Sequence, residues 1–245
     1  MLSSRLRIAA VALLSIAAVA ALPAGAVAKA RHANAIKHKV GHGTSTNWSG
    51  YAVGGTNATH VIGTWTQPTA TCSARENSWS SPWVGIDGNT SNTVEQIGTD
   101  TDCSNGVPSY YAWYEMYPQN LVVISIPVNH GNSFTGEVTG DALGNFVLRL
   151  TNNTTHNTFS TTQSASRAKR SSVEWVMEGP SNGGLTNFGS VGFTGTSATI
   201  SGQSGTVGSF GNAQPITMVT RRGGVQRAVP SQPSGDAFSV GWLHG

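Results

Sequence analysis

Three segments of this 245-residue sequence place carboxylates at alternate positions with tryptophan, tyrosine or glutamine. The segments are 83–98, 111–117 and 173–178, and they hold five of the 11 acidic residues in the chain. A carboxylate can accept or return a proton during a reaction, and a nearby amide can donate to a developing oxyanion. A solvated sheet face could carry the same carboxylates, but the Trp and Tyr beside them favour a binding groove.

The segment 81–99 predicts a β-hairpin with a turn-rich loop at 89–93. Residues of a strand alternate between its two faces, so Trp83 and Asp87 are expected on the outward face of the first strand. The same rule places Gln96 on the outward face of the second strand. The hairpin should therefore bring a Trp, an Asp and a Gln close together.

Two later segments repeat this division into an apolar face and a polar, aromatic face. In 173–178, alternation groups Glu174 with Glu178 on the polar side. In 111–117, it separates Met116 from the polar residues. The polar side of this segment comprises Tyr111, Trp113, Glu115 and Tyr117.

These motifs, in this order, resemble the glutamic endopeptidases, or eqolisins. The resemblance implies a lectin-like β-sandwich of two antiparallel sheets with a concave active-site face. It covers the chain from about residue 47 into the Gly-rich C-terminal third, where it is weak. The matching motifs are NWSG at 47–50, WVGIDG at 83–88, VEQIGT at 94–99, AWYEMYP at 112–118 and VEWVME at 173–178.

Carried over by motif, the resemblance implies that Gln96 and Glu174 form the catalytic pair. It implies an acid-acting endopeptidase with protein or peptide substrates and without a cofactor or metal ion. Met116 and the Gly-Pro pair at 179–180 depart from the family pattern, which affects substrate preference more than chemistry. The residues that match supporting or substrate-binding positions are Trp48, Trp83, Asp87, Glu115 and Tyr117.

Other hydrolase designs fit less well, because the sequence lacks an aspartic-dyad motif, a Gly-X-Ser-X-Gly elbow and a His-Glu-X-X-His helix. The main alternative is a lectin-like glycoside hydrolase or a carbohydrate-binding module. Glu174 and Glu178 would lie ~13 Å apart along a strand, farther than the ~5 to 9.5 Å of glycosidase acid pairs. Glu115 with Glu174 on neighbouring strands stays open as such a pair.

Residues 1–28 read as a secretory signal peptide, with two arginines, a 15-residue apolar run and a small-residue cleavage site. Residues 29–43 form a basic segment that predicts a disordered leader or a short propeptide. Residues 1–43 carry six of the 14 Lys and Arg and none of the acids, so residues 44–245 have a net charge of −3. The basic pI thus belongs to the leader, which argues against nucleic-acid binding. A secreted protein without a membrane anchor is expected.

Residues 44–245 are enough for one domain with a sizeable core. The 30 glycines, the many Thr, Ser and Asn, and the absence of an amphipathic helix pattern predict an all-β fold. A sandwich is the first choice and a barrel the second. In an exported chain, Cys72 and Cys103 predict one disulfide that encloses the hairpin. We expect a monomer.

Overall fold

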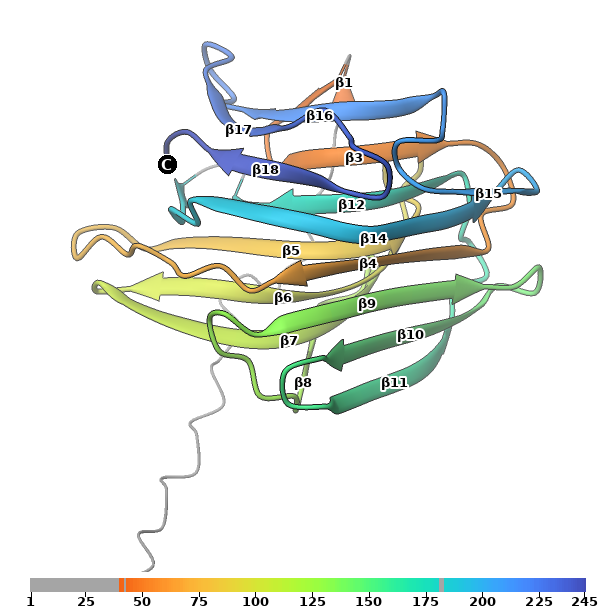
Figure 1. Cartoon of the computed structure of the whole chain (residues 1–245), viewed down its shortest axis with the longest axis horizontal. Helices are drawn as coiled ribbons and strands as arrows, with labels where there is room; N and C mark the ends of the chain where they lie inside the picture. The colour runs from red at the N-terminus through yellow and green to blue at the C-terminus, as the bar shows by residue number, and fades with distance from the viewer. Residues whose placement is uncertain (1–39, 42, 181–182) are drawn as a thin grey trace, which may run out of the picture.

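The computed structural model describes residues 40–41, 43–180 and 183–245. The predicted signal peptide and most of the predicted leader lie outside the described residues. All regular elements of the described part are β-strands (Figure 1), and it has no helix long and apolar enough to cross a membrane.

One of the two sheets, here called the site sheet, carries the three segments with carboxylates and aromatic residues. Its strand order is β16–β3–β12–β5–β6–β7–β8, and all these pairs are antiparallel. A short strand, β13 (Gly184–Leu185), runs parallel to the start of β5, beyond the residues of β5 that pair with β12. The strands are β16 (Ala213–Val219), β3 (Trp48–Gly54), β12 (Ser172–Glu178), β5 (Ser78–Ile86), β6 (Val94–Ser104), β7 (Val107–Tyr117) and β8 (Val122–Ile124).

The second sheet covers one face of the site sheet and is joined to it through β16, which pairs with β3 at one end and β17 at the other. Its strand order is β11–β10–β9–β4–β14–β18–β17. Its strands are β11 (Asn157–Ser164), β10 (Asn145–Asn152), β9 (Ser133–Gly140), β4 (His60–Thr66), β14 (Ser190–Ile200), β18 (Phe238–Trp242) and β17 (Gln226–Pro230), with β15 (Gln203–Gly205) beside β14. The predicted all-β sandwich is confirmed.

The core between the sheets is built from the apolar face of each strand. Trp175 of β12 reaches across to the second sheet, where its indole Nε1 donates to the carbonyl oxygen of Ile62 at 2.8 Å. Gly63 leaves room for this ring, because a Cβ there would lie 2.8 Å from Trp175 Cδ1. The large side chain of one sheet therefore fits against a glycine of the other.

The predicted disulfide between Cys72 and Cys103 is confirmed. It joins the segment before β5 to the far end of β6 and so encloses the whole first strand of the hairpin. Closing its 31-residue separation contributes ~3 to 4 kcal/mol in the chain-entropy account. The bond thereby restrains the strand that carries Trp83.

Several predicted strand bounds differ from the structure. The sequence pattern predicts a strand at 121–128, of which the structure keeps only β8, and it does not predict the two C-terminal strands β17 and β18. The pattern also predicts two short strands, 191–193 and 198–200, where the structure has one strand, β14, whose register against β4 shifts between Thr194 and Ser197. Such a bulge interrupts the alternation that a sequence pattern relies on.

The predicted boundary between the leader and the domain falls inside a small hairpin. Val40–Gly41 forms β1, which pairs antiparallel with β2, Thr44–Ser45. β2 in turn runs parallel to β16. The last residues of the predicted leader thus extend the edge of a sheet.

Candidate active site

The face of the site sheet that points away from the core, here called the site face, carries a row of polar residues across four strands. The register places Glu174 of β12 opposite Gly85 of β5, Gly85 opposite Gln96 of β6, and Gln96 opposite Glu115 of β7. Strands lie ~4.8 Å apart, so the backbones of Glu174 and Gln96 are roughly 9.6 Å apart with only a glycine between them. The two side chains can therefore extend toward the same space above Gly85.

Gly85 keeps this space open. A Cβ at this position would lie 3.0 Å from Gln96 Cβ, 3.0 Å from the Trp83 ring and 3.1 Å from the Glu95 carbonyl oxygen. Any larger residue would push the Gln96 side chain away from its present place. The strand alternation predicted the faces of Trp83 and Gln96 correctly, since both belong to the site face.

Glu115 fixes the orientation of the Gln96 amide. Gln96 Nε2 donates to Glu115 Oε2 at 2.5 Å, which leaves the second N–H of the amide available. Gln96 Oε1 is buried and has no hydrogen-bond partner among the described residues. Burial raises the pKa of Glu115 to about 7, and the hydrogen bond from Gln96 partly opposes this shift. A neutral Glu115 can still accept the amide N–H through its carbonyl oxygen.

Glu174 is fully buried, and burial raises its pKa well above the usual value of a Glu. The nearby Ser172 hydroxyl and Asn89 backbone N–H oppose the shift in pKa, and the charges of Asp87 and Glu95 increase it. In an acidic medium Glu174 is therefore protonated and can act as a proton donor.

An apolar row of tryptophans lies next to the polar row. Trp83 of β5 and Trp113 of β7 flank Gly98 of β6, and Trp48 of β3 packs edge-on against Trp83 with ring centroids 5.0 Å apart. A Cβ at Gly98 would lie 2.6 Å from Trp83 Cβ, so this glycine lets the two indoles approach each other. All three indoles are buried, so the row is a rigid apolar support beside the polar row.

A second acidic row lies beyond the tryptophans. Glu178 accepts hydrogen bonds from Trp83 Nε1 at 2.9 Å and from Asn47 Nδ2 at 3.0 Å. Burial raises the pKa of Glu178 to about 8 and that of Asp100 well above its usual range. The sequence reasoning overlooked Asp100 and Asp102, although continuing the alternation of Gln96 along its strand would have placed both on this face.

The Asp87 carboxylate is held by backbone groups of a distant segment and has no hydrogen bond with Glu174 or Gln96 among the described residues. The chain leaves β5 after Ile86, and Asp87 has a left-handed φ of 72°. Its carboxylate accepts the backbone N–H groups of Lys169, Arg170 and Ser171 at 2.8, 2.7 and 2.8 Å. It thus ties the hairpin loop to the segment before β12, and it influences Glu174 only through its charge.

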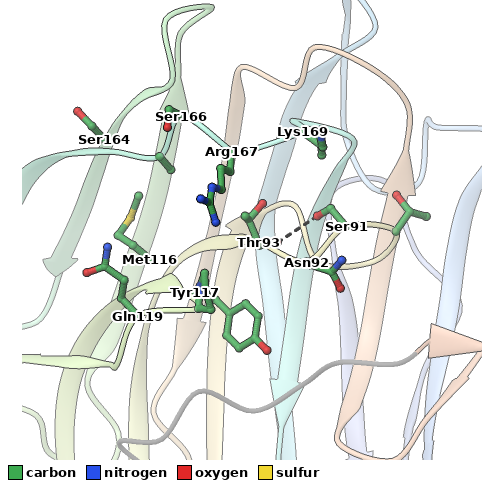
Figure 2. Close-up of a pocket in the computed structure, with 13 residues that line it drawn as sticks. Ser91, Asn92, Thr93, Met116, Tyr117, Gln119, Ser164, Ser166, Arg167 and Lys169 are labelled. Carbon is green, nitrogen blue, oxygen red and sulfur yellow. Dashed lines mark hydrogen bonds between the residues drawn. The ribbon is translucent and has the colours of Figure 1, made fainter.

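Tyr117 lies at the end of β7, on the same face as Glu115 and two residues further along the strand. It lines a pocket of about 860 Å³ that extends beyond the polar row (Figure 2). No group of three His, Cys, Asp or Glu in the described part of the chain could hold a metal ion.

Comparison with known proteins gives the class to which this fold and site belong. The sequence model of the Peptidase A4 family matches residues 46–241. The chain therefore belongs to the Peptidase A4 family and is a peptidase. This assignment argues against the alternative of a glycoside hydrolase.

Individual relatives agree with this assignment. Aspergillopepsin-2 from Aspergillus niger is 32% identical over 186 residues, which are 64% of this chain and 66% of that protein's length. The structure of scytalido-glutamic peptidase with a transition-state analogue inhibitor has a TM-score of 0.71 and 26% identity, and the match covers 81% of this chain and 98% of that chain. SCP-B, a member of the eqolisin family in complex with the tripeptide Ala-Ile-His, has a TM-score of 0.66 and 25% identity over the same shares.

Proposed function

We propose that this protein is an endopeptidase that works in an acidic medium through Glu174 and Gln96. The observation that carries the proposal is the row in which Glu174 and Gln96 flank Gly85 while Glu115 holds the Gln96 amide. Carboxyl and amide groups can supply a base, an acid and an oxyanion donor without a metal ion.

In the first step, a water molecule above Gly85 attacks the peptide carbonyl carbon. Protonated Glu174 gives its proton to the carbonyl oxygen from one carboxyl oxygen, and its other oxygen takes a proton from the water. Gln96 Oε1 accepts the second water hydrogen, and the available N–H of its amide donates to the former carbonyl oxygen. The product is a neutral tetrahedral diol, and Glu174 remains protonated.

In the second step, the same carboxyl group reverses its roles. Glu174 gives its proton to the amide nitrogen and takes one from a diol hydroxyl, and the C–N bond breaks to give an amine and a carboxylic acid. Each step conserves protons, because one carboxyl group donates and accepts together. The cycle needs Glu174 in its protonated form, which its burial favours.

The relatives support peptides as the ligand of the site face. The SCP-B structure is a complex with the tripeptide Ala-Ile-His, and that of scytalido-glutamic peptidase contains a transition-state analogue inhibitor. In this chain, the buried Trp83 and Trp113 keep the site face rigid beside the polar row. This assignment requires no cofactor.

The test compares Glu174→Ala and Gln96→Ala with the wild type on a peptide that lacks titratable groups. Each variant should lose at least about a thousandfold in kcat/KM while its thermal unfolding stays close to wild type. Glu137→Ala and Gln163→Ala, which change a Glu and a Gln of the second sheet, are the matched controls. Retention of more than about a tenth of wild-type kcat/KM by either site variant would remove that residue from the catalytic pair.

We also propose that the protein is exported and that 44–245 is the catalytic domain. The proposal is supported by the sequence pattern of 1–28 and by the family match, which begins at residue 46. Of the described residues, a chain that starts at Thr44 loses strand β1 and Gly43, so it should fold and cleave peptides as the mature secreted protein does. Failure of this shorter chain to fold, while a chain starting at Lys29 folds, would place the segment 29–43 within the domain.

A further inference from the structure

The pocket of about 860 Å³ lies at the end of the site face, between three segments of the chain. These are the hairpin loop at 90–93, the turn 117–119 after β7, and the segment 164–169 before β12 (Figure 2). We call it the end pocket. Its volume lies within the range of ~300 to 1,000 Å³ that is typical of ligand sites.

The end pocket is within reach of a peptide bound at the catalytic row. Tyr117 lines the pocket and follows Glu115 by two residues on the same face of β7, a distance of ~7 Å along the strand. An extended peptide advances ~3.3 Å per residue. A substrate residue about two positions from the scissile bond can therefore enter the pocket.

The lining of the end pocket is cationic. It includes Arg167 and Lys169 and contains no Asp or Glu. Arg167 points from its segment into the space between Met116 and Thr93 (Figure 2). Both cationic side chains are exposed, and neither has an ion pair or hydrogen bond with another residue in the described ranges.

Two arginines of the domain, Arg170 and Arg227, have internal partners, unlike Arg167 and Lys169. Arg227 is buried and donates to the carbonyl oxygens of Pro180 and Gly183. The charged groups of Arg167 and Lys169 have no such partner in the described ranges. They stay unpaired even though acidic residues outnumber basic ones in this domain, whose net charge is −3. Two unpaired cations in a ligand-sized pocket favour an anionic group of the substrate.

The walls of the end pocket are fixed relative to each other by one buried carboxylate. Asp87 Oδ2 accepts the Thr93 hydroxyl at 3.3 Å from one wall and the Lys169 backbone N–H at 2.8 Å from the other. Asp87 is itself completely buried. The fold itself therefore holds these two walls of the pocket in place.

We propose that the end pocket is a subsite that binds a carboxylate of the substrate through Arg167 and Lys169, about two residues from the scissile bond. The proposal rests on the proposed peptidase function and adds a substrate preference to it. The carboxylate can belong to a Glu or Asp side chain or to the C-terminus of the peptide. Both are largely ionised at pH 5, where the cations retain their charge.

The test uses a series of peptides in which a single Glu or Gln moves through the four positions on each side of the scissile bond. At pH 5, we expect kcat/KM for Glu to exceed that for Gln about fivefold or more at one or two positions. The double variant Arg167→Gln/Lys169→Gln should lower this ratio to about one. The matched control Arg221→Gln/Arg222→Gln changes two exposed cations that do not line the pocket and should keep the ratio.

A second set of peptides ends at the preferred position, with either a free C-terminal carboxylate or a C-terminal amide. Comparing the two sets shows whether the pocket prefers the carboxylate of a side chain or that of the C-terminus. A preference for either carboxylate that the double variant abolishes supports the subsite. A preference at no position, or one that survives in the double variant, overturns it. Cleavage of the Gln peptides without any Glu preference refutes the subsite alone, whereas absence of all cleavage refutes the proposed function as well.

Discussion

At the level of single residues, the proposed mechanism depends on the missing side chain of Gly85, which leaves space between Glu174 and Gln96. The two strands that carry the pair are not neighbours, since β5 lies between them. In the proposed mechanism, a side chain on the site face of β5 would occupy the space of the water and the peptide bond. A glycine at this position is therefore part of the site although it carries no functional group.

Gly85→Ala should reduce activity more than stability. The added methyl group lies 3.0 Å from Gln96 Cβ, so the Gln96 side chain has to move by a few tenths of an ångström. Small displacements of positioned groups cost rate, and we expect a loss of about tenfold to a hundredfold in kcat/KM. The measurement is kcat/KM on a neutral peptide together with the thermal unfolding temperature.

Gly192→Ala is the matched control for this change. Gly192 is in β14 of the second sheet, and a Cβ there meets no atom within 4 Å. This variant should keep both activity and stability. If Gly85→Ala were as active as Gly192→Ala, the space above Gly85 would not be where the reaction takes place.

At the level of elements, the strand faces could be predicted from sequence because alternation is a local property. The grouping of Glu115 with Tyr117, and of Glu174 with Glu178, needed only the period of two within one strand. The position of Asp87 could not be predicted in this way. Its partners, Lys169, Arg170 and Ser171, are 82 to 84 residues away in the sequence.

The order of the strands also lay beyond local patterns. Nothing in the residues of 94–98 or 173–178 shows that β5 separates the two strands, because pairing over such distances depends on the whole chain. The two C-terminal strands were missed for a related reason. β17 has only two buried positions, and β18 has only five residues over which apolar and polar residues could alternate. Such short patterns do not stand out from the many turn residues around them.

The tie between the hairpin loop and the segment before β12 should depend on Asp87. In Asp87→Ala, three backbone N–H groups lose their carboxylate acceptor, and buried donors without a partner are costly. We expect a loss of about 3 kcal/mol in the free energy of unfolding, measured with urea. Because the end pocket is held together by the same carboxylate, the preference for an acidic peptide should weaken as well.

Asp141→Ala serves as the comparison for the loss of a capping carboxylate. Asp141 also accepts backbone N–H groups, from Leu143 and Asn145, but it lies in an exposed turn where water can replace it. Its removal should cost clearly less stability than the removal of Asp87. Equal losses in the two variants would show that Asp87 does not organise the loops.

At the level of the whole molecule, buried carboxyl groups should make the protein most stable in acid. Burial raises the pKa of Glu115 to about 7, that of Glu178 to about 8 and that of Glu95 to about 9. Between an ordinary Glu pKa of ~4.3 and these values, the folded state keeps protons that the unfolded state has lost. Stability is therefore fully present below pH ~4 and falls as the pH rises through this window.

Each of these groups contributes a slope of up to about 1.4 kcal/mol per pH unit. Urea unfolding at pH 3.5, 5, 6.5 and 8 should show the free energy of unfolding decreasing along the series. In Glu95→Gln the dependence should be weaker, because a group on the core side of the sheet no longer ionises. Rising stability from pH 5 to 8 would contradict the assignment of buried neutral carboxyl groups.

The same protonation links the stability of the molecule to its activity. The proposed cycle uses Glu174 with its proton in place, and the orientation of Gln96 depends on Glu115, whose pKa is about 7. As the pH rises, ionisation introduces negative charge into a buried site that works in its neutral form. Activity should accordingly be high in acid and disappear as the pH rises past about 7.

The most direct test of this account is the dependence of kcat/KM on pH for the wild type and Glu174→Gln, on a peptide without titratable groups. A Gln has nearly the shape of a protonated Glu, so the variant should fold and bind substrate but be unable to relay protons. We predict a wild-type maximum well below neutral pH and a loss of at least about a thousandfold in Glu174→Gln across the range. A maximum at pH 7 or above in folded enzyme, or a Glu174→Gln variant within tenfold of wild type, would contradict it.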